Sequence, residues 1–409
     1  MRLIAISVLA SANRSGWLGL AVIPPMLFLG RGKKIQTMVF AAIAGALVSL
    51  SGPTLVFALN AVSFVGIVVV LFFWRRPVVE RKLPAERPIA ALSAGGRFIR
   101  SAPVIRRILL RAVLFIAPGS ALWGLLAVIA KDQLGQSSSG YGLMLGALGA
   151  GAVLGAVVLD PLRRVFGQNG LLIVAALGFA AATTVLALVH QVSVVLVALV
   201  VGGMAWLATL ATMNASMQLS LPGWVRARGL SVYQLVFMGG QAIGSLLWGL
   251  LAGATSSVTA LLVSAVLLVF CAVSAWWWPL HARTGDLDLT PSAHWPEPAL
   301  IFEPEPLDGP VLVLTRYRVQ PENEEEFFAA MARLGRSRQR SGASQWRVFR
   351  NIEKDSTFVE AFIVRSWGEH LHQHHTRLTG QDLIIEQAVE RYTDGESVSQ
   401  HLIAVEPVD

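Results

Sequence analysis

Polar and indole side chains gather within one apolar stretch, residues 192–220. On a helix that turns by about 100° per residue they fall on two faces. One face holds Trp206, Thr209 and Ser216, and the other holds Asn214 and Gln218. Inside a membrane such groups can contact a polar molecule, or they can hydrogen-bond a neighbouring helix at about 0.6 kcal/mol per contact. Trp123, in an earlier stretch, has a similar choice between lining a cavity and anchoring the membrane interface.

Groups that could carry catalysis or bind a metal are scarce. No Asp or Glu lies inside an apolar stretch between residues 108 and 279, because Asp132 and Asp160 both lie at the ends of such stretches. His370 and His374 are four residues apart and could share an ion on one helix face. With no cysteine or fixed third ligand beside them, we expect a solvated helix, no bound metal and no cofactor. The single cysteine, Cys271, lies in an apolar run and offers no disulfide.

The composition is that of a membrane protein. Hydrophobic residues make up 54% of the chain and charged residues 14%, with a mean hydropathy of +0.60. Ordinary soluble domains carry about 25% charged residues. The net charge of +8 is concentrated in loops between apolar spans, where positive charge orients the spans. We therefore expect a lipid bilayer as the partner and no nucleic acid.

The apolar stretches predict helices that cross the membrane. Six spans are expected at about 108–130, 140–159, 170–189, 192–220, 228–253 and 256–279. Residues 36–74 predict two more, and residues 1–35 read as a marginal or disrupted span. The long basic loop at 75–107 favours the cytoplasm, which also places the chain from residue 280 onward there. Within that loop, Ile89–Arg100 could form an amphipathic helix on the membrane surface.

Glycines at spacings of four mark where these helices approach one another closely. The expected packing positions are Gly142 with Gly146, Gly151 with Gly155, and Gly240 with Gly244. A bare backbone lets a second helix come near, which is how helices associate in lipid.

The last 130 residues change character. Residues 280–310 are rich in proline and acidic residues and predict an extended linker. Residues 311–409 alternate in the order β-α-β-β-α-β, which is that of a ferredoxin-like α+β domain. Its strands Val311–Val319 and Thr357–Val364 leave an apolar face bare, with Phe358 or Val359 on it according to register. Because exposed apolar patches usually imply a partner, we expect this domain to form a homodimer.

Several motifs carry a family resemblance. They are Asp160-Pro-Leu-Arg163-Arg164, ALWGLLAVIAKDQLG at 121–135, NASMQLSLPGWVRARGLSVY at 214–233 and DLDLTPSAHWPEP at 286–298. Together they resemble the major facilitator superfamily, in the transmembrane secretion effector branch that includes enterobactin-type exporters. SWGEHLHQHHTRLT at 366–379 resembles the antibiotic-biosynthesis-monooxygenase fold, and Trp346, Asn351 and Trp367 echo residue types used by cofactor-free members of that fold.

The resemblance implies a fold and an activity. Residues 108–279 would be the second six-helix half of the transporter and residues 36–74 the last two helices of a truncated, incomplete first half. The tenth helix of the superfamily lines the substrate cavity, which makes the polar residues of 192–220 and Trp123 candidates for substrate contact. Asp160, Arg163 and Arg164 would form a cytoplasmic latch between helices.

The implied function is secondary-active export of a small molecule, of the siderophore or drug class, across a bacterial inner membrane. Export would proceed by alternating access and be coupled to an ion, by resemblance a proton. Two alternatives stay open. The helices could tether an oxygenase-like domain, or the truncated chain could be inactive.

Overall fold

The computed structural model describes residues 61–62, 64–74, 88–280, 287–296, 300–395 and 397–405. The predictions for residues 1–35 and for 36–60 lie outside them. The chain forms two compact units. Among the described residues, the helical unit comprises 61–62, 64–74, Leu110–Ala215 and 234–280, and the mixed unit comprises 88–109, Ser216–Tyr233, 287–296, 300–395 and 397–405.

Long apolar helices build the helical unit. They are α5 (Pro103–Asp132), α6 (Ser138–Leu188), α7 (Val192–Leu219), α8 (Arg226–Ala254) and the shorter α9 (Ser257–Val273). Within the described residues, the first four are long and apolar enough to cross a membrane, and a short apolar helix covers Phe64–Phe73. In lipid a helix satisfies its own backbone hydrogen bonds, which is why such runs are helical throughout.

The 51-residue helix α6 contains two arms, which correspond to two predicted spans. Gly167 breaks it with φ 65° and ψ −178°, a left-handed backbone that favours glycine. The arms fold back on each other, because a Cβ on Gly202 in α7 would lie within 4 Å of both Leu148 and Ala182. A straight helix would hold those two residues about 50 Å apart. The break lies inside the loop predicted between residues 159 and 170, near its end, while Asp160, Arg163 and Arg164 are still helical.

Side chains from two other helices hydrogen-bond to the backbone of α5 beside a proline. Pro118 lies inside α5 and lacks an N–H. The indole N–H of Trp248 in α8 donates to the carbonyl oxygen of Ala117 at 2.7 Å. The hydroxyl of Ser264 in α9 donates to the carbonyl oxygen of Pro118, also at 2.7 Å. These bonds tie α5 to both neighbours at the level of the proline.

Three of the predicted packing glycines lie where two backbones nearly touch. A Cβ on Gly151 would lie 2.0 Å from the carbonyl oxygen of Val200 in α7, and one on Gly155 would lie 3.0 Å from the Cα of Met204. A Cβ on Gly244 would lie 2.2 Å from Oγ of Ser120 in α5.

The other three glycines of that set are not at such crossings. Gly240 makes an ordinary contact, 3.5 Å from Ile116. Around Gly142 and Gly146 a Cβ would meet nothing within 4 Å among the described residues, so the close approach expected there is absent from this part of the structure.

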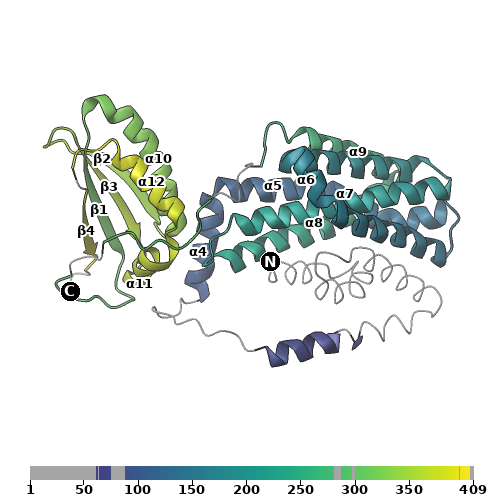
Figure 1. Ribbon diagram of the computed structural model, residues 1–409, viewed down its shortest axis with the longest axis horizontal. Helices are drawn as coiled ribbons and strands as arrows, with labels where there is room; N and C mark the ends of the chain where they lie inside the picture. The colour runs from purple at the N-terminus through teal and green to yellow at the C-terminus, as the bar shows by residue number, and fades with distance from the viewer. Residues whose placement is uncertain are drawn as a thin grey trace. The chain divides into compact units, whose positions relative to one another are not determined.

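The mixed unit contains a four-stranded antiparallel sheet (Figure 1). Its strands are β1 (Val311–Arg318), β2 (Gln345–Arg350), β3 (Thr357–Val364) and β4 (Val398–Ile403), in the spatial order β2-β3-β1-β4. The main helices are α10 (Glu324–Ser341), α11 (Trp367–His372) and α12 (Gly380–Glu390). Charge favours α10, which has three glutamates in its first turn and arginines in its last. A capping box of Thr379 and Asp382 begins α12.

Alternation along the strands gives the sheet two faces. Val313, Tyr317, Phe358 and Phe362 are buried on the side that α10 and α12 cover. The pairing of β1 with β3 sets Val359 on the opposite, open face, which decides between the two registers left open by the sequence.

Helix α4 (Pro88–Ser101) also belongs to the mixed unit. It covers the segment predicted as an amphipathic helix on the membrane surface, and it is a helix. Its apolar residues Ala94 and Phe98 are buried against protein, 1% and 6% exposed, so this face is not presented to lipid as expected. The ring of Phe98 packs edge-on against Trp224.

One glycine at a close helix crossing and one with no close neighbour give a matched test of the α6–α7 crossing. Gly151→Ala places a methyl group against the α7 backbone and should destabilise the purified protein by about 1–3 kcal/mol, lowering its thermal unfolding midpoint. Gly142→Ala, at an exposed position with no neighbour, should be neutral or slightly stabilising because alanine is the better helix former. Equal midpoints for the two variants would contradict the crossing.

Candidate functional site

Five aromatic rings from four helices form a cluster inside the helical unit. Trp206 of α7 is at its centre, with ring centroids 5.5 Å from Trp123, 5.6 Å from Phe115, 5.4 Å from Phe179 and 6.2 Å from Phe237. This set is called the aromatic cluster below. The structure therefore brings together Trp123 and Trp206, the two tryptophans singled out from the sequence.

The spacing of α5 explains how the cluster accepts the large indole. Phe115, Gly119 and Trp123 recur every four residues and share one helix face. A Cβ on Gly119 would lie 3.1 Å from the Trp206 ring, so the missing side chain leaves room for it. Within the described residues, the buried indole N–H of Trp123 has no hydrogen-bond partner. The cluster thus holds a donor without an acceptor in the part of the chain that the structure describes.

The other polar residues of α7 do not join the cluster. Thr209 is buried and donates to the carbonyl oxygen of Ala205 at 3.0 Å, within its own helix. Asn214 is half-buried in the helical unit. Ser216 is buried and Gln218 half-buried, and both belong to the mixed unit.

The residues of the predicted latch lie at the end of the first arm of α6. Asp160 and Arg164 are exposed and Arg163 is half-buried. The hydrogen bonds and ion pairs found among the described residues include none that joins these three. Their role as a latch stays a prediction.

A hollow of about 460 Å³ lies elsewhere, where α5 and the second arm of α6 end. Asp132, Gln133 and His190 line it together with apolar residues that include Val258 near the start of α9. The amide of Gln133 donates to the carbonyl oxygen of Ala187 at 2.9 Å. None of the six predicted substrate contacts lines this hollow.

Two residues that sequence reasoning missed hold the chain where it leaves α9. Arg111 is 2% exposed and donates through Nη1 to the carbonyl oxygen of Trp278 at 3.1 Å. Asn169 exchanges two hydrogen bonds of 2.8 Å with the backbone of Leu280. The sequence did carry a signal for Arg111, because it lies inside a predicted span and a cation there needs a partner.

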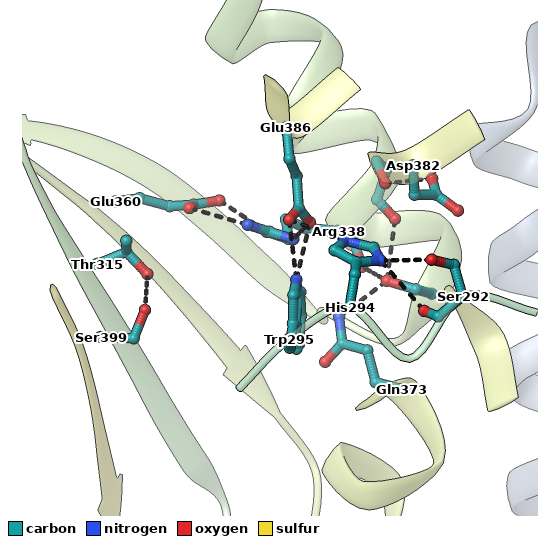
Figure 2. Close-up of polar contacts among 12 residues, drawn as sticks. Ser292, His294, Trp295, Thr315, Arg338, Glu360, Gln373, Asp382, Glu386 and Ser399 are labelled. Carbon is teal, nitrogen blue, oxygen red and sulfur yellow. Dashed lines mark hydrogen bonds and ion pairs between the residues drawn. The ribbon is translucent and has the colours of Figure 1, made fainter. Parts of the chain in front are cut away.

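A buried charge network occupies the interior of the C-terminal domain, between the sheet and its helices (Figure 2). Arg338 of α10 lies between two carboxylates, pairing with Glu360 of β3 at 3.1 Å and with Glu386 of α12. Tyr317 and Trp346 also donate to Glu360, at 2.9 and 2.8 Å. Every charge in the set is thus paired and hydrogen-bonded, as burial requires.

Part of the predicted linker closes this network and is called the strap, residues 287–296. Its backbone pairs with residues 378–381, with Ser292 N–H donating to Leu378 and Gly380 N–H donating to Thr290. At its end the indole N–H of Trp295 donates to both oxygens of Glu386, and His294 bonds Glu386 at 3.0 Å. The Arg338 guanidinium lies 4.7 Å from the Trp295 ring centre. This part of the predicted linker is docked on the domain.

His370 of α11 and His374 of the helical turn that follows it, Gln373–Arg377, face the strap rather than solvent. His370 is fully buried, and its ring lies 6.2 Å from Trp295 and 4.8 Å from His401. His374 is 3% exposed and packs edge-on against Trp295 at 5.3 Å. The expected solvated helix is therefore wrong on this side. Among the described residues, no group of three His, Cys, Asp or Glu side chains could hold a metal.

Of the residues that echo cofactor-free monooxygenases, Trp346 and Trp367 pack in one hydrophobic cluster, which does not include Asn351. Trp367 is buried and stacks on His370 at 5.3 Å, and Trp346 serves the charge network. Asn351 lies in the turn after β2, where its side chain accepts from the backbone of Glu353 and Lys354.

Burial and charge set the protonation of the strap site. Burial would raise the pKa of Glu386, but the positive charge of Arg338 and the hydrogen bonds from the strap lower it to about 2. Burial would lower the pKa of His294, yet its bond to Glu386 raises that pKa above the ordinary value. Burial, then the neighbouring His401 and His374, lower the pKa of His370 to about 3. At neutral pH the site therefore holds an ionised Glu386 beside a neutral His370.

Apolar helices of membrane-spanning length, joined to a small α+β domain, define a multi-span membrane protein. The model of the family described as transmembrane secretion effector, within the major facilitator superfamily, matches residues 31–407. The chain belongs to this family and is therefore a transmembrane transporter by membership.

Several solved structures are similar to parts of the chain, two of which follow, and no curated protein matched it. A Caulobacter crescentus protein assigned as an antibiotic biosynthesis monooxygenase is 20% identical, with 24% of this chain and 93% of that chain covered and a TM-score of 0.22. A variant of the E. coli fucose:proton symporter is 17% identical, with 59% of this chain and 58% of that chain covered and a TM-score of 0.43.

Proposed function

We propose that this chain exports a small molecule of the siderophore or drug class by alternating access, coupled to an ion gradient, with a proton as the coupling ion. Membership of the transmembrane secretion effector family supports transport. The finer assignment depends on one observation, the buried indole N–H of Trp123 that has no acceptor among the described residues. Leaving such a donor unsatisfied costs about 1–3 kcal/mol.

An acceptor that arrives and leaves would account for that donor. The rings around Trp206 offer flat apolar surfaces, which suit an aromatic substrate. A substrate with an aromatic plane and a hydrogen-bond acceptor at its edge would satisfy Trp123 while it stacks in the cluster. The alternative is that these rings only pack as a structural core. Such a core would not explain why a buried N–H is left without an acceptor in the described part of the chain.

For the C-terminal domain we propose a ferredoxin-like fold without oxygenase activity. The element order and the spatial order β2-β3-β1-β4 support the fold. Trp295 fills the interior of the domain, where it contacts Glu386, Arg338 and His374. A side chain of the protein therefore occupies the space that an oxygenase substrate would need, which disfavours the tethered-oxygenase alternative. Turnover of a quinol by the purified chain, abolished by Trp367→Ala, would reverse this assignment.

We also propose that the protein lies in a bacterial inner membrane with its C-terminal domain in the cytoplasm, on the side of the basic loop. There the open face of the sheet would pair with a second copy. Leu312 and Leu314 of β1, Val359 of β3 and Leu402 of β4 lie on this face, and Leu402 is 48% exposed. Burying such a face in a homodimer removes apolar surface from water.

Transport can be tested by removing one N–H group. Trp123→Phe keeps a ring in the cluster but loses the donor, so efflux of a bisbenzimide dye from cells should fall about tenfold, the value of one lost hydrogen bond of about 1.4 kcal/mol. Trp277→Phe changes an exposed tryptophan and should export normally. Dye accumulation at equal expression is the measurement, and Asp160→Asn in the same assay tests the latch. Equal efflux by both tryptophan variants would contradict the assigned site.

The dimer predicts a specific cross-link. With Cys271 replaced by serine, Leu314→Cys at the centre of the open face should form a disulfide between two copies when membranes are oxidised, seen as a doubled mass on a non-reducing gel. Glu390→Cys, exposed on α12, is the control and should stay a monomer. A monomeric Leu314→Cys protein would rule out pairing through this face.

A further inference from the structure

The mixed unit is more than a C-terminal domain. It also contains α4 and the segment Ser216–Tyr233, which ends α7 and begins α8. The connection between those two helices, residues 220–225, is called the α7–α8 turn below. Both α4 and the turn join predicted membrane spans, so the domain is packed against two connections of the transporter.

Glu369 of α11 makes the central contact with α4. Its carboxylate is 8% exposed and pairs with Arg97 of α4 and, at 3.1 Å, with Arg377 of the same domain. A second bond runs from Arg365 to the hydroxyl of Ser93 in α4, at 3.2 Å. A carboxylate this deeply buried depends on its cations, because removing one partner leaves an uncompensated charge.

Arg377 extends the contact to the α7–α8 turn. It is 3% exposed, and its guanidinium lies 5.2 Å from the ring centre of Trp224 in that turn. Such stacking is favourable when the cation is desolvated. Trp224 in turn packs edge-on against Phe98 of α4, with ring centroids 5.6 Å apart. Since Arg97 and Phe98 are adjacent in sequence, the contacts close into a ring.

The side chain of Arg228 packs on the backbone of α4 at the same junction. A Cβ on Gly95 of α4 would lie 3.0 Å from Cδ of Arg228, in the first turn of α8. The helix therefore has the C-terminal domain on one side and the start of α8 close by on another. Glu369 holds α4, and Trp224 holds the α7–α8 turn. If α4 and the turn moved apart, the ion pairs of Glu369 or the ring contacts of Trp224 would be lost.

We propose that the C-terminal domain is a clamp, which binds α4 and the α7–α8 turn together through the ring Arg97–Glu369–Arg377–Trp224–Phe98. The clamp fixes the separation of two transporter connections, so it restrains the movements of the spans that they join. This attachment is independent of which molecule is transported and of whether transport occurs.

A cleavable linker tests the clamp in the full chain. A protease site inserted within residues 281–286 lets the C-terminal domain, strap included, be cut from the membrane spans. If the clamp exists, the cut domain stays on washed membranes. Arg97→Gln removes a cation from α4 and cannot unfold the cut domain itself, so the domain should leave the membranes about tenfold faster.

Two further variants complete the design. Arg100→Gln changes an exposed arginine of the same helix and should retain the domain as the parent does. Glu369→Gln should release it as Arg97→Gln does. Release of the parent domain as fast as that of the variants, or equal retention by Arg97→Gln and Arg100→Gln, would overturn the clamp.

Discussion

The close crossing of α6 and α7 is the constraint on which the helical unit depends. At Gly151 and Gly203 the backbone of one helix reaches the carbonyl groups of the other, with room for no Cβ. Lipid supplies no hydrophobic drive between helices, so such contact and interhelical hydrogen bonds must hold them together. Trp206 follows Gly203 by three residues on α7, and the crossing therefore sets how far its indole reaches between α5, α6 and α8.

The C-terminal domain differs from the helical unit because charged side chains lie in its interior. Arg338 would be costly to bury alone, but Glu360 and Glu386 pair with it and three aromatic side chains complete the hydrogen bonds. One of these side chains, Trp295, comes from the strap rather than from the domain fold. The segment that leaves the last span thus becomes part of the domain core.

Patterns within one element were readable from the sequence. Apolar runs gave the helices, period-two alternation gave the four strands, and glycine spacing marked Gly151, Gly155 and Gly244 as contact points. Position along a helix was harder. The loop predicted between residues 159 and 170 contains the turn, but the helix continues through Asp160–Arg164 and breaks only at Gly167, where glycine adopts a left-handed backbone at low cost.

Contacts between distant segments could not be read, because they depend on tertiary partners. The strap looked like a free linker. The many prolines of the linker favour an extended backbone, but they do not reveal that residues 378–381 pair with the backbone of the strap. Arg111 falls inside a predicted span, but the sequence does not reveal that the carbonyl of Trp278 is its partner. The amphipathicity of α4 was visible, but lipid and protein bury such a face equally well.

The central claim is a membrane transporter whose C-terminal domain lies on the side of the basic loop. Thiol labelling of intact cells tests it most directly, with Cys271 replaced by serine and one new cysteine at a time. Thr255→Cys, between α8 and α9, should react with an impermeant maleimide. Glu325→Cys, exposed on α10, should react only after permeabilisation. Labelling of Glu325→Cys in intact cells would contradict the account.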